Sequence, residues 1–205
     1  MKLRFAFHNP KGERGVGKAI VAWTWFLGCF YNWKVLKFNY SHVELWIPDE
    51  EGGFVEGYVW ENFVCVGNAG NGRGKHRRKL PLFTGQCFSS TTRGEWCGVR
   101  FAPASEVIGK HPERWDYIEC DVDPERLEVA IAECNKLLGS KYDFLGLFGF
   151  FLPCVIQDRK KWYCSELCSW FAYLCRIIPV RYKRISPRRL AYILSKVWGE
   201  PKQLF

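Results

Sequence analysis

The sequence predicts an α+β fold in which helices pack against one antiparallel sheet. Several short segments between residues 39 and 120 alternate apolar and polar residues, as half-buried strands do. From residue 123 onward the apolar residues instead recur at helical spacing. Strands that are grouped ahead of helices, rather than alternating with them, are typical of α+β proteins. Because a chain of 205 residues can bury a sizeable core, we expect one domain over residues 1–205.

Six segments are expected to form strands. The clearest is residues 39–48, where alternation places His42, Glu44 and Trp46 on one face of the strand. The acidic, Gly-rich stretch at residues 49–53 predicts a hairpin-type turn after it. In chain order the expected strands cover residues 3–7, 39–48, 53–66 (one strand or a pair), 85–90, 96–101 and 115–120.

Five segments are expected to form helices or short apolar turns. Asp123 is a favourable N-cap, Pro124 suits the first helical position, and Gly139 suits the end of the same helix. Ser186 and Pro187 predict the start of a last amphipathic helix in the same way. In chain order these segments cover residues 18–30, 123–139, 142–151, 164–177 and 187–197.

Positive charge is the main feature of the composition. The formal net charge is +9, and much of it lies at residues 73–79 and 176–189. Such a surface suits nucleic acid, anionic lipid or an acidic cell-wall polymer, and a solvated, solubilising surface is the simpler alternative. Residues 67–79 are rich in Gly and Arg without periodicity, which predicts a mobile basic loop. Because this loop contains no aromatic residue on which bases could stack, we expect nucleic acid not to be a partner.

Most of the ten cysteines are expected to be reduced core residues. No CxxC motif or zinc-ribbon spacing occurs, so neither a metal site nor a cofactor is expected. The N-terminus lacks the apolar region of a signal peptide. Two apolar runs, residues 19–30 and 144–156, are too short and too interrupted by Gly or Pro for transmembrane spans. Contact with a membrane surface therefore stays open, and we expect a cytoplasmic or virion-associated protein.

Cys164 is the strongest candidate for a reactive group. A polar approach at residues 157–161 leads into an apolar-periodic segment, so Cys164 is expected in the first turn of a mostly buried helix. Unpaired backbone N–H groups and the positive end of the helix dipole favour a thiolate there and could bind an oxyanion. The alternative is that Cys164 is one more buried core cysteine.

A nucleophilic thiol also needs a base, and His42 is the best placed of the four histidines. It lies inside an expected strand, whereas His8 is near the terminus and His76 and His111 lie in expected loops. A strand His that faces a Cys at a helix start could form a catalytic pair. The alternative is a half-buried His that is satisfied by a neighbour such as Glu44.

Two motifs in this order carry a resemblance to a known family. Ser41-His42-Val43-Glu44-Leu45, followed much later by Trp162-Tyr163-Cys164-Ser165-Glu166-Leu167, resembles the circularly permuted branch of the NlpC/P60 papain-like hydrolases. That branch includes the YiiX-like bacterial proteins and uncharacterised phage-encoded members. In it the His strand precedes the Cys helix. The resemblance covers roughly residues 20 to 195 and implies a permuted papain-like fold with an insertion at about residues 53–79.

The resemblance implies roles for individual residues. Cys164 would be the nucleophile and His42 the base. The third catalytic residue should come from the strand after the His strand, where Ser89 is the best match. Ser90, Glu56 and Glu44 are the alternatives for that position, and Tyr163, Glu44 and Ser90 are expected to line the site or the oxyanion position.

The implied activity is cleavage of an amide by a Cys/His thiolate, through an acyl-enzyme. The amide would belong to a peptidoglycan stem peptide or an isopeptide, so the expected partner is a peptide or cell-wall substrate. One alternative is a lipid or thioester acyl hydrolase that uses the same site. A further alternative is a catalytically inert papain-like scaffold that binds a virion or host protein.

Overall fold

The computed structural model describes residues 1–10, 21–22, 26, 37–49, 54–65, 72–92, 97–144, 146, 158 and 160–204. For residues 54–65 and 72–82 it describes the backbone alone. The helix expected at residues 18–30, the turn at 49–53 and the apolar segment at 142–151 therefore lie largely outside the described residues.

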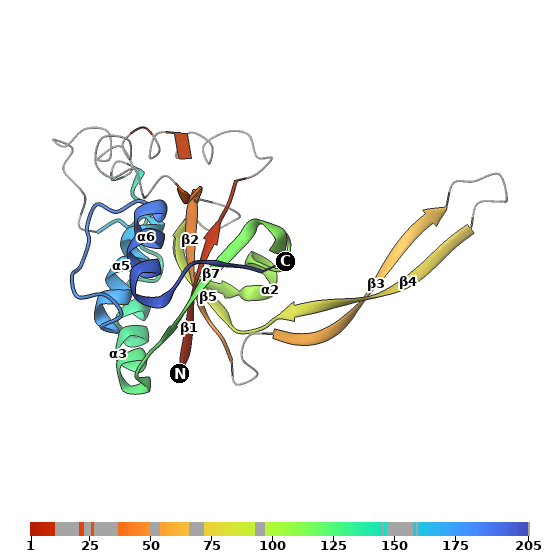
Figure 1. Ribbon diagram of the computed structural model, residues 1–205, viewed down its shortest axis with the longest axis horizontal. Coiled ribbons are helices and arrows are strands. Elements are labelled where there is room, and N and C mark those ends of the chain that lie inside the picture. The colour runs from red at the N-terminus through yellow and green to blue at the C-terminus, as the bar shows by residue number, and fades with distance from the viewer. Residues whose placement is uncertain are drawn as a thin grey trace.

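A six-stranded antiparallel sheet forms the centre of the molecule (Figure 1). The strand order is β6-β5-β2-β1-β7-β8, so β2 lies between β1 and β5. Five of these strands match segments that the alternation predicted, and the short C-terminal strand β8 was not anticipated. The strands are β1 (Lys2–His8), β2 (His42–Ile47), β5 (Gln86–Thr91), β6 (Gly98–Pro103), β7 (Trp115–Asp121) and β8 (Lys202–Gln203).

One face of this sheet is covered by three helices, α3 (Pro124–Asn135), α5 (Cys164–Leu174) and α6 (Pro187–Trp198) (Figure 1). Alternate apolar residues of the strands point to these helices and form the larger core cluster with them. Leu167 and Phe171 of α5 are 0% exposed in that cluster. Each such side chain stabilises the fold by about 1.5–3 kcal/mol through burial. The α+β class predicted from the sequence is confirmed.

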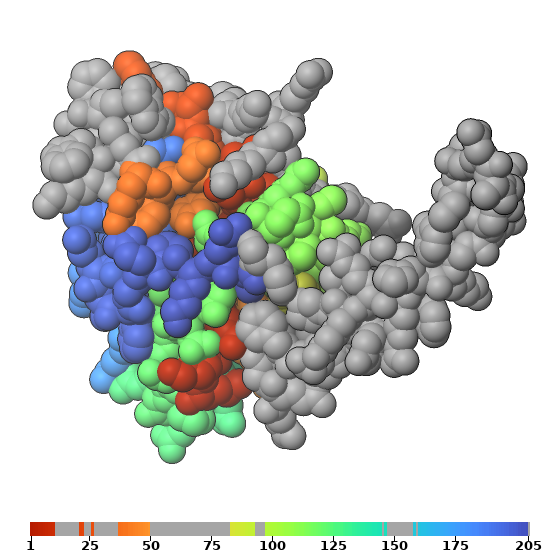
Figure 2. Space-filling model, turned by 45° about the vertical axis from the view of Figure 1, so that its right-hand side comes forward, coloured from red at the N-terminus to blue at the C-terminus, as the bar shows by residue number. Residues whose placement is uncertain are grey.

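The opposite face of the sheet carries a smaller apolar cluster. Trp46 and Trp115 belong to it, together with residues of the short helix α2 (Ala104–Val107) and with Leu204. The Leu204 N–H donates to the Trp115 carbonyl at 3.1 Å, which ties the C-terminal segment to this face. In Figure 2 the dark blue C-terminal residues accordingly reach the green residues that follow β6.

The helix boundaries follow the capping signals. The Asp123 carboxylate accepts a hydrogen bond from the Glu125 N–H at 2.9 Å at the start of α3, and Ser186 accepts from the Arg189 N–H at 3.2 Å at the start of α6. Helix α5 ends at Leu174, three residues before the predicted boundary, and Arg176 then adopts a positive φ of 55°. Within the described residues, no helix is both long and apolar enough to cross a bilayer.

A separate two-stranded ribbon joins β3 (Phe54–Cys65) to β4 (Gly72–Phe83) and projects from the body of the molecule (Figure 1). The two strands pair without a break, from Phe54 opposite Phe83 to Cys65 opposite Gly72. The prediction of an irregular loop over residues 67–79 is therefore wrong for residues 72–79, which form a strand. Pairing with the aromatic, β-branched strand β3 overrides the low strand propensity of this Gly- and Arg-rich segment.

Candidate active site

Cys164 is the first residue of α5, as the sequence predicted. Tyr163 precedes it in an extended conformation, and no side chain caps this end of the helix. The first backbone bond of the helix runs from the Leu167 N–H to the Tyr163 carbonyl at 3.1 Å. The N–H groups of the first turn therefore come before the first hydrogen bond within the helix. Together with the helix dipole they favour negative charge at this position.

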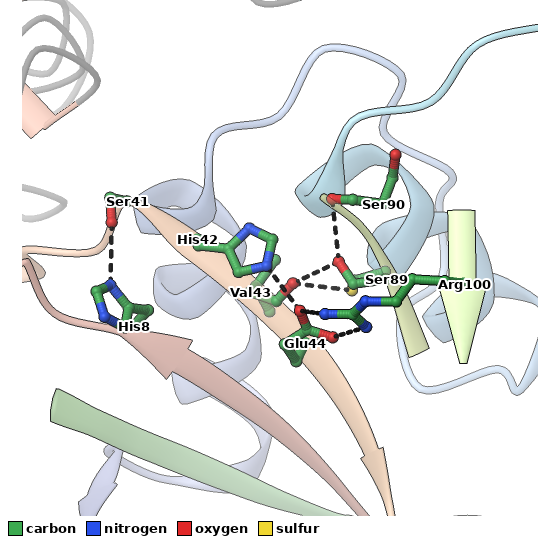
Figure 3. A network of polar contacts seen from close by, with 9 residues as sticks. His8, Ser41, His42, Val43, Glu44, Ser89, Ser90 and Arg100 are labelled. Carbon is green, nitrogen blue, oxygen red and sulfur yellow. Dashed lines mark hydrogen bonds and ion pairs between the residues drawn. The ribbon is translucent and has the colours of Figure 1, made fainter. Parts of the chain in front are cut away.

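The imidazole of His42 on β2 and the Cys164 thiol lie close enough to shift each other's pKa. The imidazole contacts Glu44 through Nε2, which lies 2.8 Å from Oε1 (Figure 3). Glu44 thereby occupies Nε2, which leaves Nδ1 as the ring nitrogen available to the thiol. His42 is 8% exposed and Cys164 is 2% exposed, so the pair is largely screened from solvent.

The two partners favour an ion pair. Burial by itself would lower the pKa of His42, but the charge and hydrogen bond of Cys164, and then those of Glu44, raise it to about 9. Burial would raise the pKa of the Cys164 thiol, but His42 and the backbone N–H of Val43 lower it overall. A thiolate beside an imidazolium is the arrangement that activates a cysteine for nucleophilic attack.

The strand pairing explains why Val43 is available to the site. The register of β2 with β5 runs only from Ile47 to Leu45, which lies opposite Phe88. Beyond Leu45 the backbone groups of Val43 that face β5 bond to side chains instead. The Val43 carbonyl accepts from Ser89 Oγ at 2.8 Å and from Cys168 Sγ at 3.8 Å, while its N–H lowers the pKa of the Cys164 thiol.

Glu44 is held from its other side by Arg100 on β6. The guanidinium donates from Nη2 to Oε1 at 2.9 Å and from Nη1 to Oε2 at 3.2 Å, across the intervening strand β5 (Figure 3). Glu44 is only 1% exposed. Burial would raise the pKa of this carboxyl, but the hydrogen bond from His42 and the charge of Arg100 lower it overall, so Glu44 stays ionised.

In the structure Glu44, rather than Ser89, contacts the imidazole of His42. The Ser89 hydroxyl donates to the Val43 carbonyl and, at 3.4 Å, to the Ser90 carbonyl, rather than to His42. Glu44 takes the position beside the imidazole instead. Residues two apart on a strand share a face, so the pairing of His42 with Glu44 was visible in the alternation, whereas the family pattern directed attention to the next strand.

Two further candidates support the backbone around the site. Ser90 Oγ donates to the Trp162 carbonyl at 2.6 Å and fixes the approach to α5. The Tyr163 hydroxyl donates to the Lys183 carbonyl at 2.6 Å and accepts from the Ile185 N–H at 3.1 Å. Both hydroxyls bond to backbone groups of neighbouring segments, and the expectation that these residues line the site or the oxyanion position stays a prediction. The side chain of Glu56 lies outside the described residues.

Arg100 and His8 are the residues that the sequence reading did not assign to the site. Arg100 lies directly opposite Ser89, which could be found only once the order of β2, β5 and β6 is known. His8 lies opposite His42 in the pairing of β1 with β2. Its Nδ1 lies 3.3 Å from Ser41 Oγ, and the Trp115 ring packs edge-on against both imidazoles.

The described residues thus bring together a cysteine, an imidazole and a carboxylate, and no cluster of His, Cys, Asp and Glu among them could hold a metal ion. Comparison with known proteins adds no assignment. No protein-family model, curated protein or solved structure matches the chain.

Proposed function

We propose that this protein is a cysteine hydrolase that cleaves an amide through an acyl-enzyme. The observation that supports the proposal is the chain of neighbouring groups from Cys164 through His42 and Glu44 to Arg100, which begins at the N-terminus of α5, where no side chain caps the helix. Cys164 would be the nucleophile and His42 the acid and base. Glu44 would hold the imidazole in one orientation, and Arg100 would hold Glu44.

The reaction would proceed in two steps. The Cys164 thiolate attacks the carbonyl carbon, and N–H groups of the first turn of α5 stabilise the oxyanion that forms. The His42 imidazolium gives its proton to the leaving amine as the C–N bond breaks. Neutral His42 then takes a proton from water, the hydroxide attacks the thioester, and Cys164 leaves as thiolate.

The order of the elements supports a permuted papain-like fold of the NlpC/P60 type. The strand that carries His42 precedes the helix that carries Cys164, and α5 packs directly on β2. The β3–β4 ribbon falls where the insertion at residues 53–79 was expected. On this basis the substrate would be a peptidoglycan stem peptide or an isopeptide, with a lipid ester or thioester as the alternative acyl group.

The burial of the pair favours a second candidate function, a catalytically inert scaffold. With Cys164 and His42 at 2% and 8% exposure, the thiol would serve packing alone if reagents cannot reach it. A scaffold of this kind would act by binding a virion or host protein. The two candidates differ in the reactivity of Cys164, which can be measured without knowing the substrate.

Short pulses of iodoacetamide between pH 5 and 9, followed by peptide mapping, provide the test. The exposed free thiol of Cys97 is an internal reference in the same sample. The hydrolase predicts that Cys164 reacts faster than Cys97 at pH 6 and that His42→Ala abolishes this advantage. Release of amino groups from purified peptidoglycan by the wild type, but not by Cys164→Ala, would then establish the bond type. Slower labelling of Cys164 than of Cys97 at every pH would instead favour the scaffold.

A further inference from the structure

The register of the β3–β4 ribbon brings together residues that are far apart in the sequence. Residues directly opposite each other in an antiparallel pair lie on the same face, and alternate residues of one strand share that face. In β4 the alternate residues Arg73, Lys75, Arg77 and Lys79 therefore share one face of the ribbon. At about 3.3 Å per residue these four positions extend over roughly 20 Å.

Three aromatic residues of β3, Phe54, Tyr58 and Trp60, occupy the same face. Tyr58 lies opposite Lys79, and Trp60 lies opposite Arg77. The basic segment contains no aromatic residue of its own, which was the reason to expect no nucleic-acid partner. The strand pairing removes that reason, because it places aromatic and basic positions side by side.

We propose that this face of the ribbon binds single-stranded nucleic acid. Lys and Arg neutralise successive phosphates, and aromatic rings supply platforms on which bases stack irrespective of sequence. The proposal concerns a surface separate from the Cys164 site and does not depend on hydrolase activity.

The distribution of residues favours nucleic acid over a membrane surface. An interfacial element separates its apolar and charged residues onto opposite faces. Here Tyr58 and Trp60 lie among the cations, and the opposite face is interrupted by Glu61, His76 and Arg78. On the face that carries Arg73 and Arg77, Glu56 is the one acidic residue among the paired positions. It lies opposite Pro81, near the end of the ribbon where Phe54 pairs with Phe83.

The test is fluorescence anisotropy of a labelled 15-nucleotide oligothymidylate with the full chain and ribbon variants. Trp60→Leu should weaken binding roughly 5- to 150-fold, the range of one lost base stack, while Trp60→Phe should retain most of the affinity. Arg77→Gln should weaken binding. It should also make the negative slope of log K against log salt shallower by about 0.7, which is the contribution of one phosphate on a single strand.

Arg78→Gln is the matched control, because it removes the same charge from the neighbouring position on the opposite face. It should retain the wild-type salt slope and nearly the wild-type affinity. Equal losses for Arg77→Gln and Arg78→Gln would overturn the proposal, as would full retention of binding by Trp60→Leu. Tighter binding to a duplex of the same length, or binding to vesicles of phosphatidylglycerol but not to the oligonucleotide at 50 mM salt, would also overturn it.

Discussion

Arg100 and Glu44 form a bidentate ion pair across strand β5, with Nη2–Oε1 and Nη1–Oε2 distances of 2.9 and 3.2 Å. Because Glu44 also accepts from His42, this pair fixes the position of the imidazole beside Cys164. The geometry of the candidate nucleophile therefore depends on a residue of β6, two strands away from β2.

Replacing Glu44 by Gln should reduce both stability and thiol reactivity. The change leaves Arg100 without its buried counter-charge, which costs about 3–5 kcal/mol when one partner of a buried pair is lost. Urea denaturation measures this cost, and iodoacetamide labelling should show that the reactivity of Cys164 at pH 6 falls. The double variant Glu44→Gln/Arg100→Met should recover part of the stability without recovering reactivity. If reactivity also returned, Glu44 would have no positioning role.

Ser89→Ala distinguishes the residue that the sequence favoured from the one that the structure places beside His42. Its hydroxyl bonds to the Val43 carbonyl, so the variant should lose about 0.5–1.5 kcal/mol of stability. The pH profile of Cys164 labelling should remain that of the wild type. A profile shifted as far as that of Glu44→Gln would show that Ser89 acts on the imidazole.

The pKa of His42 should fall in Cys164→Ala. Cys164 makes the largest contribution to raising that pKa to about 9, so removing the thiol leaves burial opposed by Glu44 alone. Titration of the imidazole Cε1–H signals by NMR measures the change, and Cys168→Ala is the control because Cys168 is equally buried four residues along α5. An unchanged His42 pKa in Cys164→Ala would argue against the thiolate–imidazolium pair.

The same ion pair gives stability a defined pH dependence. The pKa of His42 is about 9 in the folded protein and about 6.5 in the unfolded chain. The stabilisation by His42 is therefore fully present below pH of about 6.5 and is lost as the pH rises through about 9. The depressed pKa of Cys164 acts in the opposite sense, and its contribution is lost as the pH falls through the folded value. Because folding then moves a proton from the thiol to the imidazole, the two effects offset each other, and wild-type stability in urea titrations should vary little between pH of about 6.5 and about 8.5. In His42→Ala burial raises the pKa of the thiol, so the variant should lose stability relative to the wild type as the pH rises above about 8.5, and parallel curves would contradict this.

Gly98→Ala should be more destabilising than Gly139→Ala. Both glycines have a positive φ, 138° and 79°, which costs an alanine about 1–2 kcal/mol. At Gly98 a Cβ would also lie 2.2 Å from the Ser140 carbonyl oxygen, whereas at Gly139 it would meet nothing within 4 Å. Thermal unfolding should show a larger loss of stability for Gly98→Ala, which adds a steric clash to the backbone strain, than for Gly139→Ala, which has the strain alone. Equal losses of stability would mean that the backbone near Ser140 moves to relieve the clash.

The local patterns predicted much of this molecule. Strand alternation located β2 and put His42 and Glu44 on one face, and the capping signals located the starts of α3 and α6. The change from a polar approach to an apolar helix also placed Cys164 at the first turn of α5. These features depend on neighbours within a few residues, so they can be read from the chain alone.

The contacts between these elements depend on how distant parts of the chain pack together. The sheet order brings Arg100 to Glu44 and leaves Ser89 to bond to the Val43 carbonyl. In the ribbon, pairing with β3 makes residues 72–79 part of a strand where a loop was expected, and it places Trp60 opposite Arg77. Periodicity and capping act locally, so the chain alone predicts the helix of Cys164 and the strand of His42. Only the fold could decide the carboxylate's partner and the composition of the ribbon face, because both depend on which distant strands pair and in which register.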